Sequence, residues 1–560
     1  MKRVPSWLWW FAGLAVVLGV VVGLYASGAV GAAIAVGGGV AMAGAFLGGL
    51  AVVKLLLSPG TAVTGVARAL VDEALRMKVA LVFIVLLLLF VPLLPFLMDA
   101  KELLKYRLQF FLTWSVTAIS VLLSLMTVFL ACMTVSNEIA ERQVHLTLTK
   151  PVARWQYLLG KWLGIVLLNA VLVSVAGAGV YTFAKVLTGQ RARNEVDRLA
   201  VNEQIMTARD ARTPVPAGEA GLQPMFEQRF AELQAEFPDL YKDAPTPEQE
   251  KAIRQQVMLK WHTLPPLDVG VYKFEGLGAA RAMGPTVQLR VKPKASPAPP
   301  GDQVTLVFRV NGRFWPGNEG TDVPPGYLTI ANDTVYVLDV PATAVSEDGV
   351  LVVEIGNATP PSPPTPAEDG SVAEPRPPSV SFTPGEGLEV LFKVGSFEAN
   401  LAKGMLMLWL RLGFLAMLGI VAGSLVSFPV ACLLCMLVYF TSAGSGYLAE
   451  SLSSYGGSVG KDATLADMLI WPFTETAKHL GEGKVWDAVK VWIKLVGSGF
   501  MLLVPSLGEY NPIENLTDGR VIPWDWIRRA AGNVGLLWTL AVGVVGWLLF
   551  RRRELARVTV

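Results

Sequence analysis

Runs of about 20 apolar residues recur along this chain of 560 residues, and they constrain its fold more than any other feature. A run of that length, wound as a helix with a rise of 1.5 Å per residue, crosses a hydrocarbon layer roughly 30 Å thick. Only 16% of the residues are charged, against roughly 25% in soluble domains. These observations exclude a single soluble domain and predict a polytopic α-helical membrane protein.

Eight of the apolar runs are predicted to span the membrane. Basic residues gather mostly at the ends that an even number of spans places on one side, and the positive-inside rule assigns that side to the cytoplasm. Both termini, with Lys2 and Arg3 at one and the basic run 551–553 at the other, are therefore predicted to be cytoplasmic. The eight runs cover residues 7–25, 29–53, 79–98, 110–133, 162–183, 405–426, 428–448 and 530–550.

The first two runs are predicted to form an N-terminal transmembrane hairpin, residues 1–60. The first run is too long for the apolar part of a secretory signal, so we interpret it as an uncleaved anchor. The second is rich in small residues and places Gly44 and Gly48 at G-x-x-x-G spacing. That spacing lets another helix approach closely in lipid.

Residues 61–78 have a different character. Their apolar residues recur at helical spacing, and charged residues lie on the opposite face of the same helix. We therefore expect an amphipathic helix that lies along the membrane surface. Its charged residues are Arg68, Asp72, Glu73 and Arg76.

A polar stretch, residues 187–400, separates the fifth and sixth spans and is predicted to be an extracytoplasmic α+β domain. Its first part, residues 194–261, is charged and helix-prone. In its second part the apolar pattern changes to a period of two, which predicts a small β-sandwich, and the proline-rich segment 359–379 is expected to be a loop. The expected strands are 286–291, 304–310, 334–338, 351–355 and 389–394.

A second polar region, residues 449–529, follows the seventh span. It contains an amphipathic stretch, residues 485–496, whose apolar residues share one helical face. The uncharged run within the region is too short to span a membrane. We expect this region to lie on the outer leaflet, before the last helix.

The sequence offers no arrangement of residues for catalysis. The histidines His145, His262 and His479 are scattered, and residues 456–462 lack the first glycine and the final Ser or Thr of a phosphate-binding loop. The cysteines lie within apolar runs, where packing is the simpler interpretation. Lys and Arg (47) nearly balance Asp and Glu (45), so no basic field favours nucleic acid. We expect no enzyme, cofactor or metal site in this chain.

Arg411 is the one charged residue well inside an apolar run, about eight residues after Lys403. Ionisable residues within a membrane are costly and often functional. An arginine near the outer boundary can also extend its guanidinium toward the headgroups. Two interpretations therefore stay open: a residue that reaches for the interface, or one that lines an outward translocation path.

The cytoplasmic segment between the fourth and fifth spans, residues 136–161, is the most informative. It predicts a short helix with Glu138, Glu141 and Arg142, broken at Pro151, since proline lacks an amide donor and clashes with the preceding turn. Composition alone favours a solvated basic loop.

This segment resembles the cytoplasmic loop of type-2 ABC exporter permeases, whose pattern runs E-x-x-E-R, L-x-K-P-x-x-R and L-L-G-K-x-x-G. Residues 67–78 are similar to the elbow helix of that family, and residues 511–524 to the segment before the final helix of its large bacterial members. The chain departs from the family in its N-terminal hairpin, in its large insert, and at residues 142–144, where many members carry a Gly-Thr pair. The matching residues are Glu138, Glu141, Arg142, Leu148, Lys150, Pro151, Arg154, Leu158, Leu159, Gly160, Lys161 and Gly164.

The resemblance implies a permease core of six spans from Val79 onward, with a first half at 61–186 and a second half at 401–560. It further implies a separate cytoplasmic ATPase subunit that carries ATP and magnesium, a second permease copy, and a bacterial inner membrane. The residues expected at the ATPase interface are Arg68, Glu73, Arg76, Glu138, Glu141, Arg142, Lys150, Pro151, Arg154, Gly160 and Lys161.

Three further hypotheses stay open. The chain could transmit the force of ATP hydrolysis to its outer domain without transport, it could be an envelope scaffold without an ATPase, or, least favoured, it could be a membrane enzyme. The outer domain could bind an envelope protein, a lipid or a glycan, because β-sandwiches host many functions. The sequence does not identify a transported substrate.

Overall fold

The computed structural model describes residues 30–58, 60–98, 102–141, 152–216, 219–238, 247–318, 322–361, 377–445 and 505–552, with isolated residues at 22–27, 241, 245 and 473–493. The chain divides into two compact units. A helical unit combines Met1–Met206 with Phe397–Val560, and a strand-rich unit spans Thr207–Ser396. Residues 187–206 and 397–400, which the sequence analysis assigned to the insert, belong to the helical unit.

Five helices of the helical unit are long and apolar enough to cross a membrane, which confirms a polytopic helical membrane protein in coarse terms. A sixth span is added if α3 and α4, bent by 73° at their junction, are counted as one. The shorter α13 is also apolar, and the expected first span lies almost wholly outside the described residues. The long elements are α2 (Val30–Leu56), α3 (Ala62–Ala74), α4 (Lys78–Leu93), α5 (Leu104–Ala140), α7 (Arg154–Thr188), α12 (Phe397–Leu425), α13 (Phe428–Ala443) and α19 (Thr539–Arg552).

Short elements complete the helical unit. Trp524–Arg552 forms one continuous span, because α18, η5 and α19 follow one another without a break. The last span therefore begins earlier than residue 530. The short elements are η1 (Leu94–Phe96), α8 (Glu195–Ala200), η2 (Val201–Ile205), α17 (Ile513–Thr517), α18 (Trp524–Ala530) and η5 (Ala531–Trp538).

The helix α3 forms where the amphipathic pattern predicts it. Thr61 and Thr64 cap its N-terminus reciprocally, each side-chain oxygen accepting from the other residue's backbone N–H. Its buried residues, Ala67, Leu70, Val71 and Ala74, share one face. The chain then turns by 73° into α4, so a helix with a polar face is followed directly by an apolar one.

The helices α5 and α7 extend beyond the apolar runs that predicted them. With 37 and 35 residues they are each roughly 50–55 Å long, well over the roughly 30 Å of a hydrocarbon core. Glu138 consequently lies in the last turn of α5, not in a separate short helix as predicted. The polar residues after Met133 end the apolar run, but none of them breaks the helix. The expected break at Pro151 lies outside the described residues.

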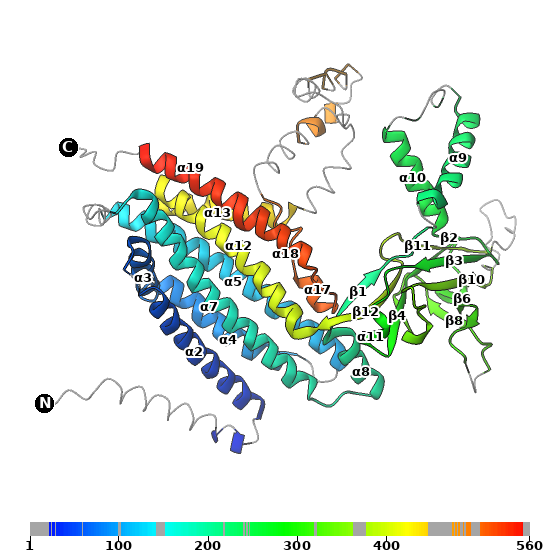
Figure 1. Cartoon of the computed structure of the whole chain (residues 1–560), viewed down its shortest axis with the longest axis horizontal. Coiled ribbons are helices and arrows are strands. Elements are labelled where there is room, and N and C mark those ends of the chain that lie inside the picture. The colour runs from blue at the N-terminus through cyan, green and yellow to red at the C-terminus, as the bar shows by residue number, and fades with distance from the viewer. Residues whose placement is uncertain are drawn as a thin grey trace. The chain divides into compact units, whose positions relative to one another are not determined.

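Small residues let the long helices approach one another in a single bundle (Figure 1). A Cβ added to Gly160 would lie 2.7 Å from Val66 Cβ of α3, and one added to Gly423 would lie 2.7 Å from the Cys132 carbonyl oxygen of α5. Gly49 faces Val171 in the same way. These contacts are too close for any larger side chain.

Two of the glycines singled out in the sequence do not take part in this packing. Among the described residues, no atom lies within 4 Å of a Cβ built on Gly44 or Gly48. The helix α2 instead approaches α7 through Gly38 and Gly49, which face Phe183 and Val171. The face that carries Gly44 and Gly48 is therefore open within the described part of the chain.

The segment before the last span is tied to the bundle. The Asn400 amide donates to the Arg520 carbonyl and accepts from the Ile522 N–H, each at 2.7 Å. Gln109 of α5 donates to the Thr517 carbonyl at 3.4 Å. Residues 505–523 thus pack on α5 and α12, and this part does not lie free on a leaflet. Most of residues 446–504 lies outside the described residues. Within the expected amphipathic stretch, residues 485–486 and 489–493 are helical, with Val491 buried and Val485, Val489, Trp492 and Ile493 exposed.

The strand-rich unit contains antiparallel sheets, among them one of four strands, β1-β12-β4-β9, and one of five, β3-β10-β6-β7 with β8 beside β6. A three-stranded sheet, β2-β11-β5, accompanies them. Leu289 and Phe392 of the first sheet and Phe308 and Val353 of the second belong to one buried cluster. Val380 and Phe382 of the three-stranded sheet belong to the same cluster. The strand-rich domain is therefore confirmed, and its classification as a small sandwich stays a prediction.

The strand bounds agree with the pattern at four of the five expected strands. The expected strand at 334–338 is displaced, since β9 begins at Tyr336 and continues to Pro341. The bounds are β1 (Thr207–Arg212), β2 (Thr263–Leu264), β3 (Val269–Phe274), β4 (Thr286–Val291), β5 (Pro293–Ser296), β6 (Gln303–Val310), β7 (Arg313–Phe314), β8 (Tyr327–Ala331), β9 (Tyr336–Pro341), β10 (Leu351–Asn357), β11 (Ser379–Phe382) and β12 (Leu388–Ser396).

A helical pair, α9 (Glu219–Glu236) and α10 (Pro247–Trp261), forms within the charged part of the insert (Figure 1). The short helix α11 (Ala280–Met283) and the turns η3 (Pro300–Asp302) and η4 (Ala342–Ala344) complete this unit. Phe226 and Leu233 of α9 pack on Ile253 and Val257 of α10 in a small cluster of their own. The helical spacing of Phe226, Phe230 and Leu233 predicts this face, whereas Phe237, which continues the spacing, follows the end of α9 and is exposed.

Candidate functional site

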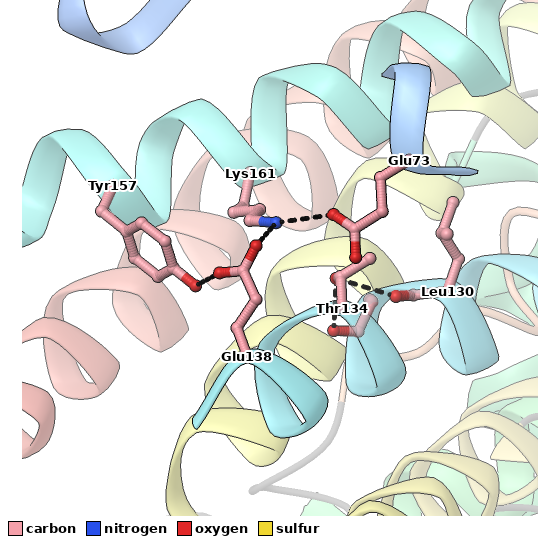
Figure 2. A network of polar contacts seen from close by, with 7 residues as sticks. Glu73, Leu130, Thr134, Glu138, Tyr157 and Lys161 are labelled. Carbon is pink, nitrogen blue, oxygen red and sulfur yellow. Dashed lines mark hydrogen bonds and ion pairs between the residues drawn. The ribbon is translucent and has the colours of Figure 1, made fainter. Parts of the chain in front are cut away.

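A network of charged and polar side chains lies at the end of the bundle where α5 ends and α7 begins, which we call the loop end. Lys161 Nζ lies 2.6 Å from Glu138 Oε1 and 3.1 Å from Glu73 Oε2 (Figure 2). The Tyr157 hydroxyl donates to the second oxygen of Glu138. These four residues, Glu73, Glu138, Tyr157 and Lys161, form the Lys161 network.

Three helices supply the network. Tyr157 and Lys161 are four residues apart on α7 and therefore lie on one face of that helix. Glu138 comes from the last turn of α5, and Glu73 from the end of α3. Gly160 and Gly164 allow α3 to lie against α7, which brings the Glu73 carboxylate within reach of Lys161.

The charges in the network are balanced locally. The side chain of Lys161 is only 3% exposed, and an unpaired ammonium at such a position would cost several kcal/mol of desolvation. Glu138, at 16% exposure, accepts from Lys161 with one oxygen and from Tyr157 with the other. Glu73 is 35% exposed, so solvent screens its share of the attraction. The pair Lys161–Glu138 is therefore the stronger of the two.

The network continues to the C-terminal end of α19. The Tyr157 ring stacks on the buried Phe550 ring, with centroids 6.2 Å apart and planes 13° apart. Arg154 Nη1 donates to the Phe550 and Arg551 carbonyl oxygens, each at 2.8 Å. The last carbonyls of a helix have no partner within it, and a cation there is favoured by the helix dipole. Arg154 thus holds the end of the last span against the start of α7.

A further ion pair joins α2 to the same end. Lys54 Nζ lies 2.5 Å from Asp72 Oδ1 of α3. Both side chains are partly exposed, so this pair contributes little to stability. It nevertheless connects the helix that follows the N-terminal run to α3. Segments from α2, α3, α5, α7 and α19 therefore meet at the loop end.

The residues proposed for the ATPase interface divide into two groups. Glu73, Glu138, Arg154, Gly160 and Lys161 contact other helices of this chain. The second group is on the surface: Arg68 lies exposed on α3, Arg76 lies exposed in the turn that follows α3, and Glu141 lies exposed at the C-cap of α5. Arg142, Lys150 and Pro151 lie outside the described residues.

Arg411 lies elsewhere, fourteen residues from either end of α12. The sequence placed it near the outer boundary, but α12 begins at Phe397, earlier than the apolar run. Its Nη2 donates to the Tyr439 hydroxyl of α13 at 2.8 Å, and its guanidinium lies 5.0 Å from the centre of that ring. Arg411 is therefore a mid-helix residue held by a tyrosine, and its role in a translocation path stays a prediction.

The cysteines are brought together by the fold. Cys132 Sγ of α5 lies 3.9 Å from Cys435 Sγ of α13, and Cys432 is buried nearby on the same helix. All three are free thiols. No group of three or more His, Cys, Asp or Glu residues in the described part of the chain is arranged to hold a metal ion.

Sequence reasoning missed Asp197, at the opposite end of the bundle. This buried carboxylate, on α8, accepts from the backbone N–H groups of Leu104 at 2.9 Å and Lys105 at 3.0 Å. Burial favours a higher pKa for Asp197, but these amides, that of Arg193 and the Lys105 charge outweigh burial and lower the pKa. Asp197 caps the N-terminus of α5 from 93 residues away, so no local pattern could have revealed it.

Comparisons with known proteins return nothing for this chain. No family model, no curated protein and no solved structure matches it. The function must therefore be argued from the geometry described above together with the motif in residues 136–161.

Proposed function

We propose that this chain is the membrane-spanning permease subunit of an ATP-driven exporter. A separate cytoplasmic ATPase, with its own ATP and magnesium, would supply the energy, and a second permease copy would complete the transporter. The observation that carries the proposal is the Lys161 network, because it joins the surface helix α3 to the ends of α5 and α7. The loop motif that resembles type-2 exporters lies between those two helix ends.

The network gives the loop end the properties that a coupling element needs. Displacing the loop between α5 and α7 would act on Glu138 and Lys161, and through them on α3. Arg154 and the Tyr157–Phe550 stack carry the same displacement to α19. A push on one small surface would therefore tilt several spans together.

The motif residues differ in how exposed they are, which narrows the set that we assign to the ATPase contact. The Glu138 side chain is only 16% exposed, so little of its charge is accessible to another subunit. Glu141, Arg68 and Arg76 are exposed at the same end of the bundle, and they are the residues we assign to contact with the ATPase. Charge-assisted contacts of this kind are worth about 1–3 kcal/mol each.

Glu141→Arg tests the assignment. We expect the purified variant to retain its thermal stability, while the amount of ATPase that co-purifies from native membranes falls about tenfold, as the loss of about 1.4 kcal/mol predicts. Glu195→Arg is the matched control, because Glu195 is equally an exposed acidic residue but lies on α8, at the opposite end. Subunits are quantified by mass spectrometry in mild detergent.

Two results would count against the exporter. If no ATPase co-purifies with the intact wild-type chain, the loop motif does not mark a coupling site and an envelope scaffold becomes the better hypothesis. If Glu141→Arg and Glu195→Arg lose the ATPase equally, the contact does not depend on the loop end.

A second candidate is a mechanical coupler that acts on an envelope protein or glycan without transport. It is favoured by the absence of a linker, since β12 ends at Ser396 and α12 begins at Phe397. A displacement of α12 would pass directly into the strand. Insertion of a flexible Gly-Ser segment between these two residues should abolish the activity of a coupler and leave ATP-dependent export by a permease largely intact.

A further inference from the structure

A groove of about 610 Å³ lies between α7 and α12, which run side by side (Figure 1). Its lining is almost entirely apolar and extends from Ala170 to Tyr181 on α7 and from Glu398 to Trp409 on α12. The groove lies along the C-terminal half of α7 and the N-terminal half of α12 and is separate from the Lys161 network.

Side-chain size explains why a groove forms here. Its floor is buried, with Gly177 against Met405, whose Cγ would lie 2.9 Å from an added Cβ. Its walls carry small exposed residues, Ser174 and Ala178 on α7 and Ala402 on α12. The helices touch at the floor, but these small side chains leave the space above it unfilled.

Two tryptophans close the groove toward the loop end. Trp409 donates its indole N–H to the Val166 carbonyl at 3.0 Å, and Trp162 donates its own to the Gly413 carbonyl at 2.8 Å. These reciprocal bonds join α12 and α7 where the groove ends. The space is therefore a slot with one closed end.

The length of the slot matches half a membrane. Glu398 and Trp409 are eleven residues apart, which corresponds to about 16 Å along a helix. The hydrocarbon core of a bilayer is roughly 30 Å thick, so one leaflet contributes about 15 Å. A single acyl chain fits that length, with its headgroup at the end that carries Glu398.

Opposite charges stand at that end. Lys185 Nζ lies 3.3 Å from Glu398 Oε1, and the Tyr181 hydroxyl donates to the same oxygen at 3.2 Å. Lys185 and Glu398 are 50% and 45% exposed, so both face the surroundings. A headgroup with a phosphate and a primary ammonium matches this pair, because the ammonium donates to a carboxylate and the phosphate accepts from a lysine.

We propose that this groove is a binding site for one phosphatidylethanolamine molecule. An acyl chain lies between the walls of α7 and α12, the phosphate lies at Lys185 and the ammonium at Glu398. The assignment rests on apolar lining, length and charge complementarity. It does not depend on whether the chain exports a substrate.

Native mass spectrometry of the full chain tests the site. The protein is delipidated in detergent and titrated separately with phosphatidylethanolamine, phosphatidylcholine and phosphatidylglycerol. We expect one phosphatidylethanolamine to bind with about tenfold preference over either other lipid, a difference of about 1.4 kcal/mol. Choline has no N–H to donate to Glu398, and glycerol has no cation.

Variants separate the groove from the rest of the lipid-facing surface. Ala178→Trp and Ala402→Trp fill it from opposite walls, and each should weaken phosphatidylethanolamine binding at least tenfold. Val544→Trp is the control, because Val544 is an exposed apolar residue of α19. Glu398→Gln should abolish the preference over phosphatidylcholine, and Lys185→Gln should weaken binding of both of these lipids.

Three outcomes would overturn the proposal. Either Ala→Trp variant, folded as judged by its melting temperature, could bind phosphatidylethanolamine as tightly as wild type. The preference among lipids could survive both Glu398→Gln and Lys185→Gln. Finally, a chain that lacks residues 1–25 could bind the lipid while the full chain does not, which would mean that the N-terminal segment occupies the groove.

Discussion

Two cations within the same bundle, Lys161 and Arg411, are accommodated in opposite ways. Lys161 lies against the carboxylates of Glu138 and Glu73. Arg411, midway along α12, is held by the hydroxyl and ring of Tyr439. The acidic residues of the described spanning helices lie near helix ends, among them Glu138, Glu398 and Asp525. No carboxylate on these helices is level with Arg411.

The two sites differ in whether the cation has a carboxylate partner. At the loop end, charges from three helices neutralise one another, so the pair Lys161–Glu138 fixes how α5 and α7 meet. Removal of one partner leaves the other buried and uncompensated, which costs more than the pair itself contributes. Within the described part of the chain Arg411 contacts the neutral Tyr439 and no carboxylate, so its removal strands no opposite charge there. Stability measurements should therefore separate the two.

Lys161→Met should produce the largest effect. The substitution keeps the apolar length of the side chain but leaves the Glu138 carboxylate without its cation, and we expect a loss of about 3–5 kcal/mol in the free energy of unfolding. Thermal unfolding in detergent measures it. The double variant Lys161→Met with Glu138→Gln should recover much of the loss. An unchanged melting temperature for the single variant would remove the argument for a balanced network.

Asp197→Ala should have an intermediate effect, of about 1–2 kcal/mol at neutral pH, because two N–H groups at the start of α5 lose their acceptor. The pKa of Asp197 lies below its ordinary value of 3.8. The carboxylate therefore stabilises the fold at every pH above that value, and this contribution is lost as the pH falls through the folded pKa. Melting temperatures of wild type and Asp197→Asn should accordingly converge below about pH 4. A constant difference down to pH 3 would mean that the carboxylate charge contributes nothing.

Arg411→Met should have the smallest effect, within about 1 kcal/mol, because the partner that the guanidinium leaves behind among the described residues, Tyr439, is neutral. The same unfolding assay as for Lys161→Met applies. A loss as large as that of Lys161→Met would show that Arg411 has a counter-charge, on a second copy of the chain or on a part of it outside the described residues, and would erase the contrast between the two sites.

The local pattern was sufficient where neighbours in the chain decide the structure. The amphipathic spacing of residues 61–78 predicted α3, and the period-two pattern predicted both ends of β4, β6, β10 and β12 to within two residues. The local pattern failed where a helix continues beyond its apolar residues. The apolar run ends at Met133, yet α5 continues to Ala140. Polar residues end the apolar run, but they do not break the backbone hydrogen bonds of the helix.

The candidate site shows the same limit. The sequence selected Glu73, Glu138 and Lys161 through a resemblance, and it had no means to show that they contact one another across 88 positions. It missed Tyr157 in the network. It also favoured Gly44 and Gly48 for packing, whereas Gly38 and Gly49 are the glycines of α2 that face α7. Spacing along one helix identifies a face of small residues, but it does not show which face packs against a neighbouring helix.

By itself, the sequence determined that this protein is a set of membrane-length helices with a strand-rich insert, because hydrophobic length and period are properties of consecutive residues. Only the tertiary structure decided which charges are neutralised and which spaces stay open. Lys161 has its carboxylates because α3, α5 and α7 converge. The groove exists because small residues on α7 and α12 face each other. Both depend on distances through space, which the order of residues does not specify.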